Sequence, residues 1–261
     1  MAFRYAEAVW KGDGQSGGSY IGVPPKLVVH TTETVGLPSY AGGASAPHIT
    51  YDPNTRQFTQ HTDLNTAARA LRNEAGGVET NRANAYQLEV ICYSAKHIAD
   101  QSPSRLWVGD LEDTAYDDIR DLAGFLNIPL VWPGHQALSY AEANAPGFRM
   151  AGSDWLDFHG IVGHQHVPEN THWDPGAFDW TRLIGDNMEQ FYKDIQRNLN
   201  AARFTDKNGN PLLVDGVWGP ATKQAHRKLC LAAAEPRGFM KRAKKLFVRK
   251  GTTVIIGDPD V

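Results

Sequence analysis

The chain has 261 residues, 41% of them hydrophobic, which is enough for one sizeable globular domain and a small second one. Its net charge of −3 conceals an asymmetry: residues 1–195 carry 13 basic and 24 acidic side chains, whereas residues 196–261 carry 13 and 5. No apolar run approaches the ~20 residues of a membrane span, and the first residues lack the apolar core of a signal peptide. We therefore expect a protein first held in the cytosol and not inserted in a membrane, with a basic C-terminal part suited to a polyanion.

Apolar runs and helical patterns alternate over the first three quarters of the chain. Buried or half-buried strands are predicted, in chain order, at 26–30, 48–51, 56–60, 86–92 and 160–164. Helices are predicted at 114–126, where Thr114 and Asp117 suggest a capping box, at 148–158 and, as one long amphipathic helix, at 179–199. This order predicts an α/β domain over 1–195, with a central mixed sheet flanked by helices.

A second, mainly helical unit is expected over 196–261. A turn at 206–211 is followed by Gly-Pro punctuation within 214–225, which predicts a tight turn into a helix. Residues 234–250 are basic and predicted to be partly helical.

Histidines and carboxylates gather where predicted strands end. His30 and His164 each end an apolar run, Asp174 lies in an Asp-Pro-Gly turn, and Glu89 lies in the middle of a strand. Each has an ordinary structural explanation when taken singly, and His166 could ligate a metal instead of its neighbour. Together they suit zinc, and three protein ligands would leave a position for water, as in a hydrolase.

The motifs resemble those of the type 2 N-acetylmuramoyl-L-alanine amidases, zinc enzymes that include many phage endolysins and are related to the peptidoglycan-recognition proteins. The resemblance covers roughly residues 20–190 and is carried by these segments: Val28-Val29-His30-Thr31-Thr32, Ala46-Pro47-His48-Ile49-Thr50-Tyr51, Phe58-Thr59-Gln60, Asn84-Ala85-Tyr86-Gln87-Leu88-Glu89, Gly163-His164, Asp174-Pro175-Gly176 and Phe178-Asp179-Trp180.

The resemblance implies that His30, His164 and Asp174 hold one zinc ion. Glu89 matches the catalytic glutamate of the family, and His172 stands where relatives often carry a lysine facing the metal-bound oxygen. Zinc would activate water and polarise the amide carbonyl, Glu89 would move the proton to the leaving amine, and His172 would stabilise the oxyanion. The implied scissile bond is the amide between N-acetylmuramic acid and L-alanine of the stem peptide.

Two departures from the family concern the substrate cleft. Pro47 stands where some relatives carry a catalytic tyrosine, which gives Glu89 more weight. Ala67-Ala68-Arg69 replaces a common Ala-Trp-His segment, which puts the usual cleft contact in doubt. Substrate-binding candidates are Thr32, His48, Arg69 and, in the second unit, Trp218.

The second unit resembles a helical peptidoglycan-binding module through Val214-Asp215-Gly216-Val217-Trp218-Gly219-Pro220-Ala221-Thr222. The alternative is a turn and helix that only pack on the first domain. Its basic segment 241–245 would attract anionic wall polymers. We expect a monomer that acts on peptidoglycan and has no nucleic-acid partner.

The whole pattern predicts a phage endolysin that is made in the host cytoplasm and reaches the wall through holin pores. Three alternatives remain open at this point: a cytoplasmic wall-recycling amidase, a non-catalytic peptidoglycan-binding protein on the same fold, and a metal-dependent hydrolase of another bond.

Overall fold

A computed structural model of the whole chain describes residues 3–185, 188–215, 220–222, 224–225, 228, 248–249 and 252–253. The chain forms two compact units, Met1–Ile184 and Gly185–Val261. This division lies eleven residues before the boundary expected at 196, and the roles expected of the two units remain predictions. In the described part of the chain, every helix is too short or too polar to traverse a bilayer.

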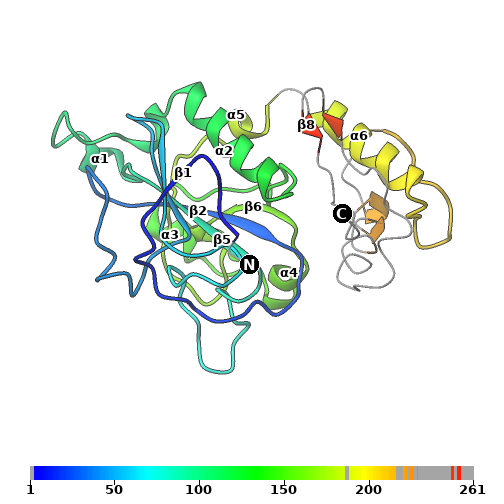
Figure 1. Cartoon of the computed structure of the whole chain (residues 1–261), viewed down its shortest axis with the longest axis horizontal. Coiled ribbons are helices and arrows are strands. Elements are labelled where there is room, and N and C mark those ends of the chain that lie inside the picture. The colour runs from blue at the N-terminus through cyan, green and yellow to red at the C-terminus, as the bar shows by residue number, and fades with distance from the viewer. Residues whose placement is uncertain are drawn as a thin grey trace. The chain divides into compact units, whose positions relative to one another are not determined.

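A six-stranded mixed sheet forms the centre of the first unit, as the sequence predicts (Figure 1). Its order is β1-β4-β3-β5-β2-β6. The strands are β1 (Ala8–Trp10), β2 (Lys26–Thr31), β3 (Ile49–Asp52), β4 (Gln57–Gln60), β5 (Ala85–Val90) and β6 (Gly160–Gly163). Strands β3, β5, β2 and β6 run parallel, so their carboxyl ends share one edge of the sheet. The short edge strand β1 was not predicted.

The helices of the first unit are mostly short, and the capping box predicted for one of them is wrong. They are α1 (Lys96–Ala99), α2 (Asp113–Phe125), α3 (Tyr140–Ala143), α4 (Gly152–Asp157) and α5 (Trp180–Ile184), with 3₁₀ turns η1 (Val108–Asp110) and η2 (His164–His166). The N-cap of α2 is Glu112, without a side-chain cap, so Thr114 lies inside the helix and forms no capping box. The predicted helix 148–158 shortens to α4.

The long helix predicted at 179–199 is two helices in different units. After α5 the chain turns at Gly185, whose φ of +70° lies in the left-handed region that glycine adopts without a Cβ clash. The next helix, α6 (Met188–Ala201), belongs to the second unit.

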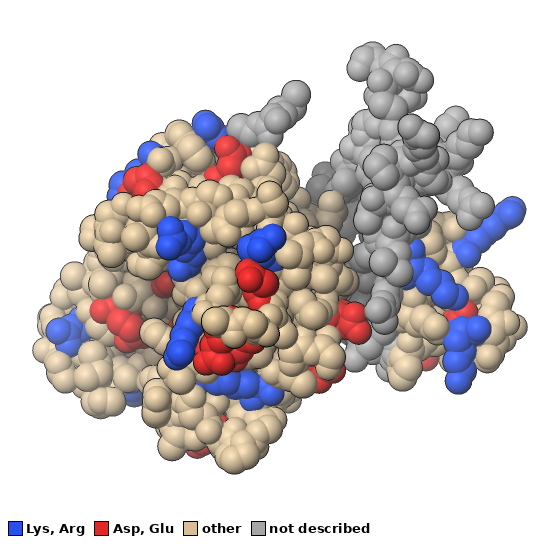
Figure 2. All heavy atoms as spheres, turned by 90° about the horizontal axis from the view of Figure 1, so that it is seen from below, with Lys and Arg blue, Asp and Glu red and all other residues tan. Residues whose placement is uncertain are grey.

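In the second unit, α6 is held to the chain that follows it. Gln196 donates to Asp215 Oδ1 at 2.7 Å, and Asn200 accepts from the Leu212 amide at 2.6 Å. Strands β7 (Val248–Arg249) and β8 (Thr252–Thr253) pair antiparallel. Figure 2 shows mainly basic side chains over the described part of this unit, whereas both signs are interspersed on the first. Trp218 and most of the basic segment 234–250 lie outside the described residues.

Alternate residues of β2 pack on opposite faces of the sheet. Val29 belongs to the core that contains the α2 residues Ile119 and Leu122, whereas Val28 packs with Trp155 of α4 on the other face. Because side chains alternate along a strand, His30 faces the same side as Val28. The end of β2 therefore presents His30 on the face opposite α2.

Lys26, at the start of β2, is fully buried on the same face. Its Nζ donates to the carbonyl oxygens of Pro24 and Ala83 at 3.0 and 2.8 Å and lies 5.0 Å from the Trp155 ring centroid. Burial lowers the pKa of this amine to about 7, and Asp157 opposes the shift only in part.

The stability of the fold should therefore depend on pH through Lys26. An unfolded lysine has a pKa of ~10.4, so between pH 7 and that value the Lys26 amine carries a proton in the unfolded chain but not in the folded one. The free energy of unfolding therefore rises with pH over this range. Below pH 7 the folded chain also holds the proton, and the full cost of burying the charge is present. Lys26→Met should show a smaller rise between pH 7.5 and 9.5 than the wild type in urea titrations at fixed temperature. Equal rises would show that Lys26 is not the responsible group.

Candidate metal centre

A row of polar side chains crosses the carboxyl edge of the sheet. Thr50 of β3 pairs in register with Glu89 of β5, and Glu89 pairs with His30 of β2. On the other side of β2, Val29 pairs with Gly163, so the next residue, His164, comes beside His30. The topology thus brings together three of the predicted site residues, which lie up to 134 positions apart in the chain.

The side chains of His30, His164 and Asp174 converge there. All three are buried, and one ligand atom from each lies within 4.8 Å of the other two. The distance from His30 Nδ1 is 3.0 Å to His164 Nδ1 and 3.5 Å to Asp174 Oδ2, and His164 Nδ1 lies 3.2 Å from Asp174 Oδ1. Ligands bound tetrahedrally at 2.0–2.1 Å are separated by about 3.3–3.4 Å, so this set fits zinc.

Gly163 allows the carboxylate to reach the two histidines. A Cβ at this position would lie 2.5 Å from Cδ of Pro175, because the Asp174-Pro175 turn packs directly against the end of β6. The Gln165 amide donates to the Asp174 carbonyl at 2.9 Å and fixes the turn beside His164. The motif Gly163-His164 with Asp174-Pro175 therefore has a steric basis.

Burial and mutual contact set the charge of the ligand atoms. Burial and the neighbouring His164 lower the pKa of His30 to about 4, so its imidazole is neutral at pH 7. Burial by itself would raise the pKa of Asp174, but the facing histidines hold it well below its usual range. Two imidazoles and one carboxylate are a donor set suited to zinc. In addition, buried His30 Nε2 has no hydrogen-bond partner among the described residues.

Glu89 lies next to this group, with a side chain that is only 12% exposed. Its Oε1 is 4.0 Å from His30 Nδ1, and its Oε2 has no partner within the described chain. Burial raises the pKa of Glu89 well above its usual value, and the negative charges of Asp174 and Glu33 add to the shift. A carboxyl group with raised proton affinity beside a metal site can take and return a proton.

His172 stacks on the ring of His164. The two rings stack with centroids 4.6 Å apart, and His172 Nδ1 is 3.6 Å from Asp174 Oδ1, beyond a good hydrogen bond. Asp174 raises the pKa of His172. The His172 side chain is 70% exposed, so it can contact a bound molecule. The side chains of His30, His164 and Asp174 are buried.

His166 is engaged elsewhere and does not join the metal group. Its Nδ1 accepts from the Gly163 amide at 3.0 Å, and its Nε2 lies 2.8 Å from the His135 carbonyl oxygen. One ring nitrogen is thus bound at the end of β6 and the other at the backbone of His135. The alternative in which His166 ligates the metal finds no free nitrogen.

The substrate-binding candidates are dispersed. His48 is fully buried, with Nδ1 accepting from the Gln87 amide at 3.0 Å and Nε2 lying 2.8 Å from the Thr66 carbonyl oxygen. Thr32 follows β2, and its Oγ1 accepts from Thr34 Oγ1 at 2.9 Å. Trp218 lies outside the described residues.

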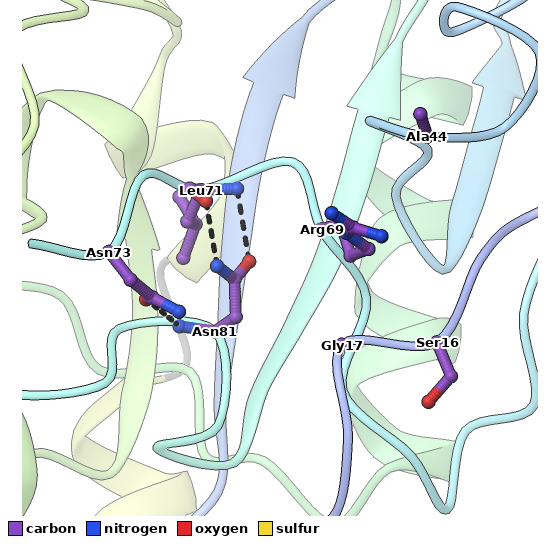
Figure 3. A pocket seen from close by; sticks show the side chains of 7 residues that line it. All are labelled: Ser16, Gly17, Ala44, Arg69, Leu71, Asn73 and Asn81. Atoms are coloured by element: carbon purple, nitrogen blue, oxygen red, sulfur yellow. Dashed lines mark hydrogen bonds between the residues drawn. The ribbon is translucent and has the colours of Figure 1, made fainter.

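Arg69 lines a pocket of about 390 Å³ beside the loop that contains Ser16 and Gly17. Figure 3 shows its side chain between the Leu71–Asn81 wall and the loop at Ser16. Arg69 Nη1 donates to Gln15 Oε1 at 3.1 Å. The other lining residues are Ser16, Gly17, Ala44, Leu71, Asn73 and Asn81. The pocket is polar, and Arg69 is its single charged lining residue.

The sequence pattern did not indicate Arg149, which organises the loop around the site. Arg149 Nη1 donates to the carbonyl oxygens of His164 and Gln165 at 3.2 and 3.0 Å, and Nη2 donates to that of His172 at 2.8 Å. Glu33, whose charge reaches Glu89, was also missed. No motif marks either residue, because their partners are largely backbone groups.

The structure thus has an α/β fold with a buried His-His-Asp group at the carboxyl edge of its sheet. No protein family model and no curated protein sequence matches the chain. Three solved structures resemble it. A point mutant of PlyL has 16% sequence identity and a TM-score of 0.35, and the match covers 65% of this chain and 86% of that one. The Staphylococcus aureus hydrolase AmiA in complex with its ligand has 11% identity and a TM-score of 0.38, with 67% of this chain and 74% of that one covered, and a selenomethionine derivative of AmpD has 16% identity and a TM-score of 0.39, with 70% of this chain and 97% of that one covered.

Proposed function

We propose that this chain is a zinc-dependent N-acetylmuramoyl-L-alanine amidase. The observation that carries the proposal is the convergence of His30, His164 and Asp174, with ligand atoms within 4.8 Å and Glu89 beside them. The choice of substrate rests on the order and spacing of the motifs that resemble the type 2 amidases.

The described side chains divide the work of amide hydrolysis. Bound by His30, His164 and Asp174, zinc would supply Lewis acidity to the amide carbonyl and to water. Glu89 accepts a proton from water at Oε2, which has no hydrogen-bond partner among the described residues, and returns it to the leaving amine. His172, exposed above His164, donates a hydrogen bond to the oxygen that becomes negative in the transition state.

His172→Ala should lower kcat by ~10²–10³, the range for loss of one oxyanion donor, and retain stoichiometric zinc. The imidazole is largely exposed and is not among the three converging ligand residues, so its loss should leave the metal in place. Steady-state kinetics on purified walls and elemental analysis of the same preparation measure the two effects. Loss of zinc would place His172 among the ligands, and unchanged kcat would remove it from the reaction.

Mass spectrometry of digested peptidoglycan tests the proposed bond directly. Free stem peptides beginning with L-alanine, together with intact glycan strands, are expected. Cleaved stem peptides or phosphoesters would show a hydrolase of another bond. Wall binding without products and without zinc would show a non-catalytic binding protein, and activity confined to small soluble fragments would favour a recycling amidase.

The biological setting is a further part of the proposal. The chain acts as a phage endolysin, made in the host cytoplasm and released through holin pores, and its second unit binds the wall. Support comes from the two-part layout and from the basic excess of residues 196–261. Anionic wall polymers would be held through charge, so wall binding should weaken with rising ionic strength.

A further inference from the structure

The buried carboxamide of Asn170 has an orientation that its backbone partners determine. Its Oδ1 accepts from the Arg72 amide at 3.0 Å, and its Nδ2 donates to the carbonyl oxygens of Arg72 and Pro168 at 3.1 and 2.9 Å. Backbone amides only donate and carbonyls only accept, so a flipped carboxamide would lose all three bonds. Asn170 is only 4% exposed, which would make those losses costly.

The fixed carboxamide dictates where His164 carries its proton. Asn170 Oδ1 lies 2.9 Å from His164 Nε2, and an amide oxygen can only accept. His164 must therefore donate from Nε2, which leaves the lone pair of the neutral ring on Nδ1. Nδ1 is the atom that lies 3.0 Å from His30 Nδ1 and 3.2 Å from Asp174 Oδ1.

We propose that Asn170 is a positioning residue for the metal, because its carboxamide oxygen holds the His164 proton on Nε2 and presents Nδ1 as the ligand atom. The inference rests on the metal site of the proposed function. Asn170 also joins His164 to the backbone of Arg72, between two residues that line the pocket of Figure 3.

The second histidine of the site provides an internal contrast. His30 presents the same Nδ1 atom, but its buried Nε2 has no hydrogen-bond partner among the described residues. Within the described chain, no hydrogen bond at Nε2 therefore fixes the His30 proton there, in contrast to the bond from Asn170 at His164. One ligand is oriented in advance and the other is not.

Glu169 offers a matched control in the same loop. Its carboxylate accepts from the Glu74 and Val78 amides at 3.0 and 2.7 Å. Glu169→Ala therefore loosens the same loop contact without removing the partner of His164. Asn170→Leu removes the acceptor, whereas Asn170→Asp keeps an oxygen acceptor for His164 and loses the two donations to carbonyls.

The test uses the full-length chain and two measurements that need no enzyme activity. Long-range ¹H–¹⁵N spectra of the metal-free protein report the tautomer of His164, with its ring assigned by its loss in His164→Gln. Competition with a chromophoric chelator reports the zinc dissociation constant. We expect an Nε2–H tautomer in the wild type, in Asn170→Asp and in Glu169→Ala, with similar zinc affinities. Asn170→Leu should lose this preference and bind zinc ~10–100-fold more weakly.

Several results would overturn the inference. These are an Nδ1–H tautomer in the wild type, wild-type affinity in Asn170→Leu, an equal loss in Glu169→Ala, or failure of Asn170→Asp to retain affinity. A wild type that binds no zinc would remove the metal site and this inference together. Zinc binding without amidase activity would overturn the proposed function and leave the role of Asn170 intact.

Discussion

Asp174→Ala should remove the metal and the activity together. Asp174 supplies the only carboxylate among the three converging residues, and its oxygens lie 3.2 and 3.5 Å from the two imidazole nitrogens. Without it, two neutral imidazoles remain, with neither the third ligand nor a negative charge to balance a dication. The zinc dissociation constant should rise well beyond the ~10–100-fold typical of losing an outer hydrogen bond to a ligand. Elemental analysis and chelator competition measure the loss.

The control is Asp110→Ala, which removes an exposed carboxylate outside the metal group. It should keep one zinc per chain and wild-type release of stem peptides. Circular dichroism should show both variants folded, since the substitution at Asp174 only shortens a side chain. Stoichiometric zinc in folded Asp174→Ala would refute the ligand set.

Glu89→Gln should retain zinc and lose the reaction. The glutamine side chain has nearly the shape of the glutamate side chain, so the packing beside His30 should be preserved. Its amide group cannot accept a proton from water. Loss of a general base costs typically ~10²–10⁴ in rate, and we expect kcat to fall by that factor. Initial rates on purified walls, at a zinc content verified for each preparation, measure the effect.

Glu33→Gln distinguishes proton transfer at Glu89 from the effect of a nearby negative charge on Glu89. Glu33 also raises the pKa of Glu89, but its Oε1 accepts from Thr31 and from the Ser94 amide at 2.7 and 2.9 Å. We expect this variant to keep most of the activity. A loss as large as that of Glu89→Gln would mean that charge alone, and not proton transfer at Glu89, supports catalysis.

The sheet could be predicted from local apolar pattern, and the converging His-His-Asp group from its place at strand ends together with the family resemblance. Apolar runs marked β2, β5 and β6, and parallel strands necessarily bring the residues at their carboxyl ends to one edge. The break between α5 and α6 could not be read from amphipathic periodicity, because the pattern continues across Gly185 while the backbone turns there.

The residues that support the site could not be predicted from the sequence, for a different reason. Asn170 is oriented by backbone groups of another segment and Arg149 binds backbone carbonyls, and every residue offers such groups. Sequence alone therefore says nothing about which partners they meet. His166 is the reverse case: its residue type and position suggested a ligand, but its two nitrogens contact the Gly163 amide and the His135 carbonyl oxygen.

The residues that could hold a metal come from three places in the chain: the end of β2, the end of β6 and the turn at Asp174. An unfolded chain cannot gather them, so a bound ion would act as a cross-link that only the native state possesses. At a free zinc concentration one hundred times the dissociation constant, this linkage would add about 2.7 kcal/mol to the stability of the fold. Chelation would then shorten the lifetime of the enzyme as well as silence it, and the supply of zinc where the protein works would govern its persistence.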